Sequence, residues 1–206
     1  MRVAVLGGTG SFGAALARRL TEAGAEVVIG SRDAERARAA AAELSCDGMT
    51  NAEAAASADL VFLAVKADAA LEAAREHAEA IGETPLFSVA AELSFSPTGV
   101  RPTTDARSLA ERIQDVVHGP VVAGLHSLAA ATLGGEEAPE EDAFVCGDDE
   151  AAKELALELA GRLVRGRAID AGPLASARAL EGMTAVIINV NRRYKARVGL
   201  RLNGLE

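Results

Sequence analysis

Short apolar runs alternate along the chain with longer segments in which apolar residues recur at helical spacing. Val3–Leu6 is an apolar run closed by Gly7, a pattern typical of a buried parallel strand. The next segment, residues 11–23, has apolar side chains at helical spacing and stops at Gly24. Further strands are predicted at Glu26–Gly30, Asp59–Val65, Leu86–Ala90, Val121–Leu125, Ala143–Cys146 and Arg167–Ala171. Further helices are predicted at Asp33–Leu44, Asn51–Ser57, Ala67–Ala80, Ser108–Val117, Asp149–Leu163 and from Gly172 to Tyr194. This alternation predicts an α/β fold with a doubly wound, mainly parallel sheet.

The length of the chain, 206 residues, leaves room for one α/β domain and a small appendage. We expect the sheet domain to cover residues 1–171 and a small helical C-terminal segment to cover residues 172–206. Within that segment, Met183–Val190 is apolar on nearly all sides, so we expect it to be buried, in the subunit interface of a homodimer. Gly134–Asp142 is rich in glycine and acidic residues and is interpreted as an exposed loop.

The composition limits the function. Asp and Glu number 30 against 21 Lys and Arg, which gives a net charge of −9. A protein that binds nucleic acid needs an excess of cations to displace phosphate counterions, so this class is excluded. No apolar run reaches the roughly 18 residues of a membrane span, and no signal peptide is visible. Cys46 and Cys146 lack metal-binding spacing, so we interpret them as free thiols of a cytoplasmic protein with no metal site.

The first chemical motif follows the first predicted strand and opens the first predicted helix. The residues Gly8-Thr9-Gly10-Ser11-Phe12-Gly13 match the spacing G-x-G-x-x-G. Gly8 permits a tight turn, Gly10 lets a pyrophosphate approach the backbone, and Gly13 lets helix and strand pack closely. Free N–H groups at the helix start then bind phosphate, so the motif predicts a Rossmann-type dinucleotide site in residues 1–171.

The second motif lies where the second strand ends, at Gly30-Ser31-Arg32. An NAD-binding protein usually has an acidic residue here, which bonds the ribose 2′-hydroxyl. This chain has a hydroxyl and a guanidinium instead, and Arg36 can reach the same point from the following helix. Ser31, Arg32 and Arg36 therefore predict a pocket for the 2′-phosphate of NADP. The alternative is a pair of solvated Arg side chains at a helix start, with Asp33 as the N-cap.

Residues that donate protons are scarce. The Tyr-x-x-x-Lys pair of short-chain reductases is excluded, because the only tyrosine is Tyr194 and position 198 is Val. We expect His77, in a polar helix, and His118, in a turn, to be solvated. His126 follows an apolar strand at the edge of the sheet where ligands bind, so it is either a ligand contact or a structural histidine.

A bound NADP without a clear proton donor suits hydride transfer between two cofactors, because the cofactors themselves supply the reacting groups and the protein only orients them. Two alternatives stay open. One is an NADP-dependent reductase of a small carbonyl or imine substrate, with His126 as the proton donor. The other is a non-enzymatic NADPH-binding sensor.

The sequence also resembles a known family, the NADPH-dependent reductases of the deazaflavin coenzyme F420. The resemblance runs over nearly the whole chain. It is carried by Arg2-Val3-Ala4-Val5-Leu6-Gly7-Gly8-Thr9-Gly10, Val28-Ile29-Gly30-Ser31-Arg32, Gly48-Met49-Thr50-Asn51, Leu125-His126, Val145-Cys146-Gly147-Asp148-Asp149 and Asp170-Ala171-Gly172-Pro173-Leu174. The last of these leads into Ser176-x-Arg178-x-x-Glu181-x-x-Thr184, which general Rossmann proteins do not share.

The resemblance implies hydride transfer between nicotinamide and deazaflavin rings that stack face to face. It implies that NADP is held by Thr9–Phe12, Ser31, Arg32 and Arg36, and that Val65, Ala69, Ala91 and Ala130 line the path from adenine to nicotinamide. It implies that F420 meets His126, Arg178, Thr184 and Val198, with the segment 172–206 closing the deazaflavin site.

The C-terminal part of this acidic chain is locally basic, with Arg192, Arg193, Lys195, Arg197 and Arg201 close together. Coenzyme F420 carries a phosphate and a glutamate-bearing tail, which this cluster can attract. Solvated charges that favour the dipole at a helix end are the other interpretation.

Overall fold

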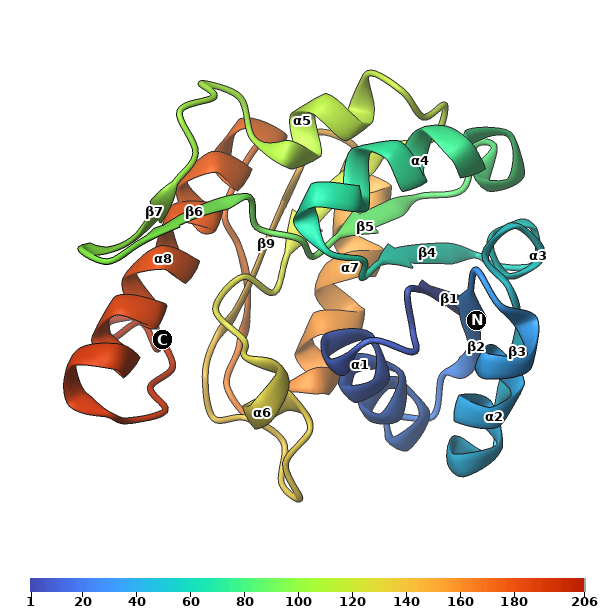
Figure 1. Ribbon diagram of the computed structural model, residues 1–206, viewed down its shortest axis with the longest axis horizontal. Coiled ribbons are helices and arrows are strands. Elements are labelled where there is room, and N and C mark those ends of the chain that lie inside the picture. Colours follow the sequence, from blue (N-terminus) through green and yellow to red (C-terminus); the bar gives the residue numbers. More distant parts are fainter. Residues whose placement is uncertain (206) are drawn as a thin grey trace.

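An eight-stranded sheet runs through the middle of the protein, with helices on both of its faces (Figure 1). This computed structural model describes residues 1–205. The strands of the sheet are β1 (Arg2–Leu6), β2 (Glu26–Ser31), β3 (Asp47–Thr50), β4 (Leu60–Leu63), β5 (Leu86–Ser88), β8 (Val121–Gly124), β9 (Ala143–Gly147) and β10 (Ala168–Asp170). The helices are α1 (Ser11–Glu22), α2 (Ala34–Leu44), α3 (Asn51–Ala56), α4 (Ala67–Ile81), α5 (Leu109–Gln114), α6 (Ala130–Leu133), α7 (Glu150–Leu163) and α8 (Ala177–Tyr194), with a 3-10 turn at Leu174–Ser176. The predicted α/β fold is confirmed.

The strand order is β10-β9-β8-β5-β4-β1-β2-β3. The chain winds from β1 outward to β3 and then returns to place β4 on the other side of β1, so the winding direction switches between β1 and β4. Ligands of doubly wound sheets bind at this switch point, beyond the carboxyl ends of the strands. The sheet is parallel from β3 to β8, whereas β9 lies antiparallel to β8 and β10 runs with β9. The connection from β8 to β9 starts and ends at the same sheet edge and holds only the four-residue helix α6.

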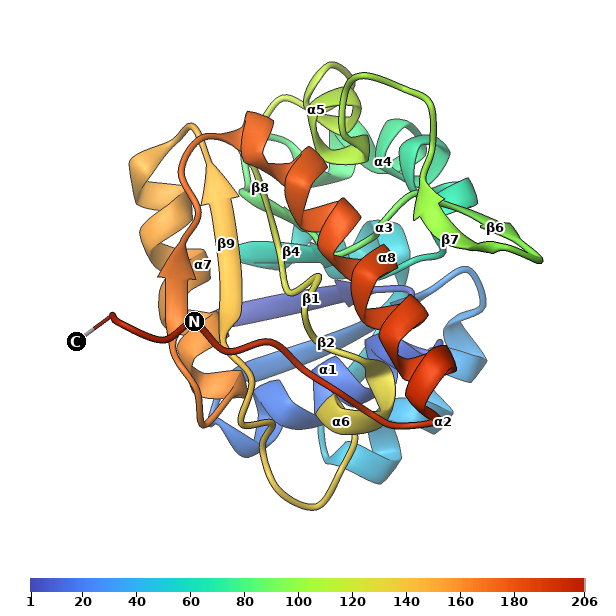
Figure 2. The same ribbon diagram turned by 90° about the vertical axis from the view of Figure 1, so that its left-hand side faces the viewer.

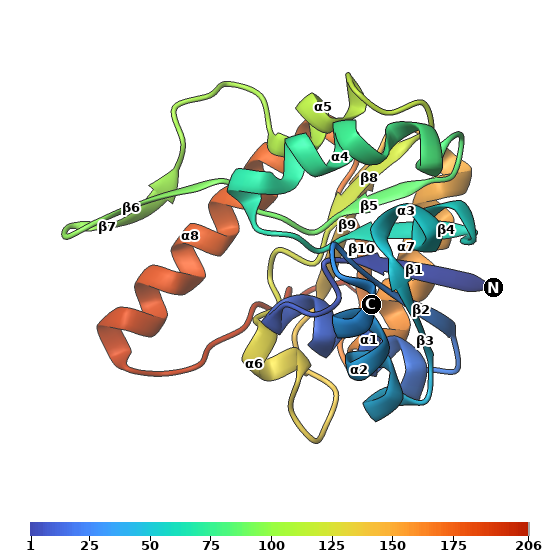
Figure 3. The same ribbon diagram turned by 45° about the vertical axis from the view of Figure 1, so that its right-hand side comes forward.

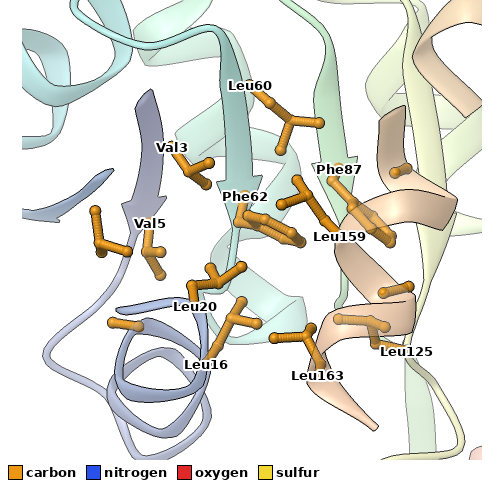
Figure 4. Packing of buried hydrophobic residues seen from close by; sticks show 14 of the residues in the cluster. Val3, Val5, Leu16, Leu20, Leu60, Phe62, Phe87, Leu125, Leu159 and Leu163 are labelled. Atoms are coloured by element: carbon orange, nitrogen blue, oxygen red, sulfur yellow. The ribbon is translucent and has the colours of Figure 1, made fainter. Parts of the chain in front are cut away.

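Buried apolar side chains fill both sides of the sheet. Helices α1, α2 and α7 pack on one face, where the rings of Phe62 and Phe87 stack with their centres 4.8 Å apart (Figure 4). Helices α3, α4, α5 and the first turns of α8 pack on the other face. Because Leu174, Ala177 and Leu180 belong to this second cluster, the C-terminal segment shares the core of the sheet domain.

Besides the short helix α6, two elements are absent from the sequence-based prediction. One is β3, which follows a left-handed residue, Ser45, and extends the sheet beside β2. The other is a hairpin of β6 (Leu93–Ser96) and β7 (Gly99–Pro102), which projects away from the sheet alongside α8 (Figure 3). The amide of Asn189 on α8 fixes the hairpin, because it accepts from the N–H of Val100 at 2.8 Å and donates to its carbonyl at 2.7 Å.

Two predictions of exposure were wrong, one in a helix and one in a loop. His77 is buried, because it continues the inward stripe of Ala70 and Ala74 on α4. Val186, in the stretch expected to be buried in a subunit interface, is 58% exposed within this chain because α8 extends beyond the sheet, and its burial against a second copy stays a prediction. In the loop 134–142, Asp142 is fully buried in an ion pair with Arg167.

The last residues return from α8 to the edge of the sheet (Figure 2). We call residues 196–205 the C-terminal strap. Its near end is fixed where the N–H of Val198 donates to Asn191 Oδ1 at 2.7 Å. Further along, the carbonyl of Leu200 accepts from the N–H of Asp142, and the N–H of Leu202 donates to the Asp142 carboxylate at 2.7 Å.

Candidate functional site

The glycine loop joins β1 to α1 at the switch point of the sheet. Gly7 has a φ of +79°, and the N–H of Gly10 closes a turn onto its carbonyl at 2.9 Å. A Cβ on Gly13 would lie 2.4 Å from the carbonyl oxygen of Gly7, so this position admits only glycine. Gly10 is exposed, and a side chain there would occupy the path by which a phosphate reaches the backbone. The loop therefore has the geometry that the sequence motif predicts.

The N-terminus of α1 offers free N–H groups. No side chain caps it, and the first helical bond runs from the N–H of Ala14 to the carbonyl of Gly10. Side chains of Asp33, Thr50, Ser108 and Asp149 cap α2, α3, α5 and α7, whereas α4, α6 and α8, like α1, have no side-chain cap. The uncapped N–H groups, together with the positive end of the helix dipole, fit a diphosphate.

A Gly13→Ala substitution should lower the free energy of unfolding by about 1–3 kcal/mol, because the new methyl group overlaps the loop backbone. The distorted loop should also raise the KM for NADPH at least about tenfold. Urea unfolding and steady-state kinetics measure the two effects. Gly161→Ala is the matched control: its Cβ would meet Ala168 at 3.6 Å, an ordinary contact inside α7, so stability should rise. Equal effects of the two variants would contradict the tight-packing role of Gly13.

Ser31, Arg32 and Arg36 lie together at the end of β2 and the start of α2. Ser31 is buried and its Oγ accepts from the N–H of Asp33 at 3.3 Å, while both guanidinium groups are exposed. Among residues 1–205, neither Arg32 nor Arg36 has a carboxylate within salt-bridge distance, although Arg38, on the same helix, pairs with Glu35. The Asp33 side chain is the N-cap of α2 and accepts from the N–H groups of Glu35 and Arg36. Unpaired guanidinium groups beside a hydroxyl suit a dianionic phosphate.

The end of β4 forms the opposite wall of the glycine loop. A Cβ on Gly7 would meet Val65 Cγ1 at 2.8 Å, so Val65 packs directly against the loop. Ala69 is exposed on the first turn of α4, and its N–H donates to the carbonyl of Lys66. Lys66 is the N-cap residue of α4 and is also unpaired among the described residues. The sequence analysis missed this third cation. Its position directly after an apolar strand could have indicated that it lies at the ligand-binding edge of the sheet.

His126 lies where the carboxyl ends of β5 and β8 meet. Its Nε2 is 3.3 Å from the carbonyl oxygen of Ala90, the neighbour of Ala91, and its own carbonyl accepts from Thr184 Oγ1 at 2.8 Å. Burial lowers the pKa of His126 to about 4, so the ring is neutral near pH 7. Its Nδ1 has no partner among residues 1–205, and neither has the hydroxyl of the fully buried Ser88 at the end of β5. Sequence reasoning missed Ser88, the polar residue within an otherwise apolar strand.

Neither Arg178 nor Val198 has a hydrogen bond to His126 among the described residues. The guanidinium of Arg178 pairs with Glu181 at 3.0 Å and also donates to the carbonyl of Thr103, at the base of the hairpin. Glu181 is buried, accepts from the N–H of Leu109 at 2.7 Å, and has its pKa raised to about 7 by that burial. The contact of Val198 is with Asn191, at the other end of α8. The structure thus places Thr184, but neither Arg178 nor Val198, against His126.

Ala130 opens α6, which packs beside α1. Arg19, almost fully buried on α1, donates to the carbonyls of Leu133 and Gly135, at 2.9 and 2.7 Å, and also to that of Glu137. This guanidinium fixes the end of α6 relative to the helix that carries the glycine loop. Its role was not visible in the sequence, because its partners lie more than 100 residues away.

The fold and the site define a class of protein: an oxidoreductase with a dinucleotide site of the NADP type. Residues 2–92 match the family described as NADP oxidoreductase, coenzyme F420-dependent. Over its full length the chain is 32% identical to the F420-dependent NADP reductase of Methanocaldococcus jannaschii, and covers 100% of that protein. It is 36% identical to the F420-dependent NADP reductase of Methanothermobacter marburgensis, of which it covers 99%. The chain belongs to the F420-dependent NADP reductase family.

Solved structures share the fold. A crystal structure from Arthrobacter sp. FB24, provisionally named an F420-dependent NADP reductase, superposes with a TM-score of 0.84 at 28% identity and covers 99% of this chain and 100% of that chain. An imine reductase from Streptomyces aurantiacus superposes with a TM-score of 0.64 at 22% identity, and this chain covers 62% of it. No helix among residues 1–205 is long and apolar enough to cross a membrane.

Proposed function

We propose that the protein transfers a hydride between NADP(H) and coenzyme F420 at the carboxyl edge of the sheet. The observation that carries this proposal is the pairing of an uncapped α1 N-terminus with two guanidinium groups that lack carboxylate partners. These groups fit the diphosphate and the 2′-phosphate of NADP. The names of the relatives supply the second cofactor, F420.

When bound, NADPH would supply the hydride and the oxidised deazaflavin would accept it, while the proton that completes the reduced deazaflavin would come from solvent. The protein therefore has little covalent chemistry to perform. The glycine loop, Ser31, Arg32 and Arg36 hold the dinucleotide by its phosphates. The neutral, buried His126 ring lines the edge where β5 and β8 end. With a pKa of about 4 it holds no ionisable proton near pH 7, so its part is to shape and desolvate the site.

The same histidine argues against reduction of a small carbonyl or imine. That reaction needs a proton donor, and His126 was the one candidate in the sequence. A ring that stays neutral down to about pH 4 is a poor acid. A non-enzymatic NADPH sensor would bind NADPH without turnover.

The further contacts of the site are proposals of the same kind. Val65, Ala69, Ala91 and Ala130 line the dinucleotide, and His126, Thr184, Arg178 and Val198 surround the deazaflavin. Support is strongest for Val65, which packs on the glycine loop, and for Thr184, which bonds to His126. Residues 172–206 act as the segment that closes the deazaflavin site over the NADP-binding domain 1–171.

We further propose a cytoplasmic homodimer. Cys46 and Cys146 are both free thiols, as expected, and a reducing compartment preserves them. The outward face of α8 carries Val186 and, at its end, Tyr194, and a second copy would cover these exposed side chains.

Purified protein mixed with NADPH and F420 should bleach the visible absorbance of the oxidised deazaflavin, and the reaction should run backward with NADP and reduced F420. A cyclic imine offered with NADPH alone should give no turnover. Absence of bleaching at every pH between about 5 and 9, where His126 stays neutral, would contradict the proposed function. NADPH binding without turnover of either acceptor would favour the sensor.

A further inference from the structure

The last turn of α8 and the first residues of the strap carry four exposed cations, Arg192, Arg193, Lys195 and Arg197. We call these residues the basic turn. Among residues 1–205, none of them lies within salt-bridge distance of a carboxylate. The guanidinium of Arg192 lies 5.6 Å from the ring centre of Phe95 on the hairpin.

Acidic residues outnumber basic ones 30 to 21, so carboxylates are available to pair with exposed cations. Three exposed helix cations have such partners: Arg38 pairs with Glu35, Arg75 with Glu72 and Arg162 with Glu158. Outside the basic turn, the cations without a carboxylate partner among residues 1–205 are those beside the dinucleotide site, together with Arg101 and Arg201. The chain thus leaves cations free at the predicted phosphate pocket of NADP and, in a second group, at the end of α8.

Arg201 does not belong to this second group. It lies on the strap between Leu200 and Leu202, both tied to Asp142, and lines a hollow with Glu137, Glu140 and Glu141. The fold therefore separates Arg201 from the four cations of the basic turn, although all five are close in the sequence.

The basic turn lies at a defined distance from the site. Thr184 bonds to the carbonyl of His126, and Arg192 follows eight residues later on the same helix, a rise of about 12 Å. The bond from the N–H of Val198 to Asn191 folds the strap back onto α8, which keeps Arg197 beside the last turn.

We propose that the basic turn binds the anionic tail of coenzyme F420, its phosphate and glutamate carboxylates. The inference rests on the proposed function and extends it to the part of the cofactor that takes no part in hydride transfer. The helix dipole accounts for cations in the last turn, Arg192 and Arg193. It leaves unexplained Lys195, the left-handed C-cap, and Arg197 beyond it. An anionic tail accounts for all four.

The test compares the affinities of two ligands for three proteins by titration calorimetry, without NADP. The ligands are F420 and its riboside analogue, which lacks the phosphate and the glutamates. The proteins are the wild type, a triple variant of the basic turn (Arg193→Gln, Lys195→Gln, Arg197→Gln), and a control triple variant (Arg38→Gln, Arg75→Gln, Arg162→Gln). Both variants lose the same charge, so any effect of net charge alone cancels.

At low salt the wild type and the control should bind F420 about tenfold more tightly than the riboside, as expected for several partly screened charge pairs. The basic-turn variant should lose most of this preference, while its affinity for the riboside changes less than about twofold. About 0.5 M salt should erode the preference in the wild type. An equal affinity of the wild type for both ligands, a full preference in the basic-turn variant, or an equal loss in the control would overturn the proposal. If the wild type binds neither ligand, the proposed function fails, and this inference with it.

Discussion

Replacement of both Arg32 and Arg36 by Ala should raise the KM for NADPH about a hundredfold. Each guanidinium has no carboxylate among the described residues, so each is available to the 2′-phosphate. A charge-assisted hydrogen bond contributes about 1.5–3 kcal/mol, and solvent compensates part of the loss of two. The phosphate lies far from the reacting carbon, so binding should weaken equally in the ground and transition states, and kcat should change little. Steady-state kinetics with F420 as acceptor measure both constants.

Arg38→Ala is the control for this pair, because Arg38 lies on the same helix and is paired with Glu35. Its KM for NADPH should stay within about twofold of the wild type, as expected for a rim charge. NADH lacks the 2′-phosphate, so its KM should be the same in the wild type and in the double variant. An unchanged KM for NADPH in the double variant would place the 2′-phosphate elsewhere.

Substitution of Asp142 by Asn should lower the free energy of unfolding by about 1–2 kcal/mol, because it removes the buried carboxylate that pairs with the partly exposed Arg167 guanidinium. The carboxylate is fully buried, lies 2.7 Å from the Arg167 guanidinium, and accepts from the N–H groups of Arg167 and Leu202. Urea unfolding at pH 7 measures the loss. Since the strap is tied at Asp142, the KM for F420 should rise as well, while the KM for NADPH stays close to that of the wild type.

The same carboxylate predicts a pH dependence. The Arg167 guanidinium holds the pKa of Asp142 at about 2, below its ordinary value. Its stabilisation is therefore complete above about pH 4 and is lost as the pH falls toward about 2. The Asn variant should lack this part of the acid dependence. Asp115→Asn is the control: Asp115 pairs with Arg107 but both side chains are about half exposed, so the loss of stability should be much smaller than at Asp142. Equal losses of stability at the two positions would contradict the special role of the buried Asp142 carboxylate.

The sequence predicted the parts of the fold that are encoded locally. The strand, glycine loop and helix from β1 to α1 are specified by contiguous residues, and so is the Ser31–Arg32 turn after β2. The hairpin β6–β7 was missed because half of its side chains are polar or exposed and Pro102 interrupts its pattern. Asp142 was assigned to a loop surface because its partners, Arg167 and Leu202, are 25 and 60 residues away.

The same division applies to the candidate site. The residues expected to meet phosphate are neighbours in sequence, so a motif finds them. The surroundings of His126 require the fold, since Ala90 reaches it from the end of β5 and Thr184 from α8. The resemblance to the reductase family supplied Thr184 and Arg178 as residues, but only the structure shows that the Arg178 guanidinium is engaged with Glu181 and Thr103.

The two reversed strands, β9 and β10, determine the path that α8 takes across the sheet. Because β9 and β10 run against β8, the chain leaves β10 at the opposite edge from the cofactor. Helix α8 must then travel the height of the sheet before Thr184 meets His126, and its remaining turns overhang the edge to support the hairpin. A single helix thereby covers this edge of the sheet, and a change in its length would move the hairpin relative to the glycine loop.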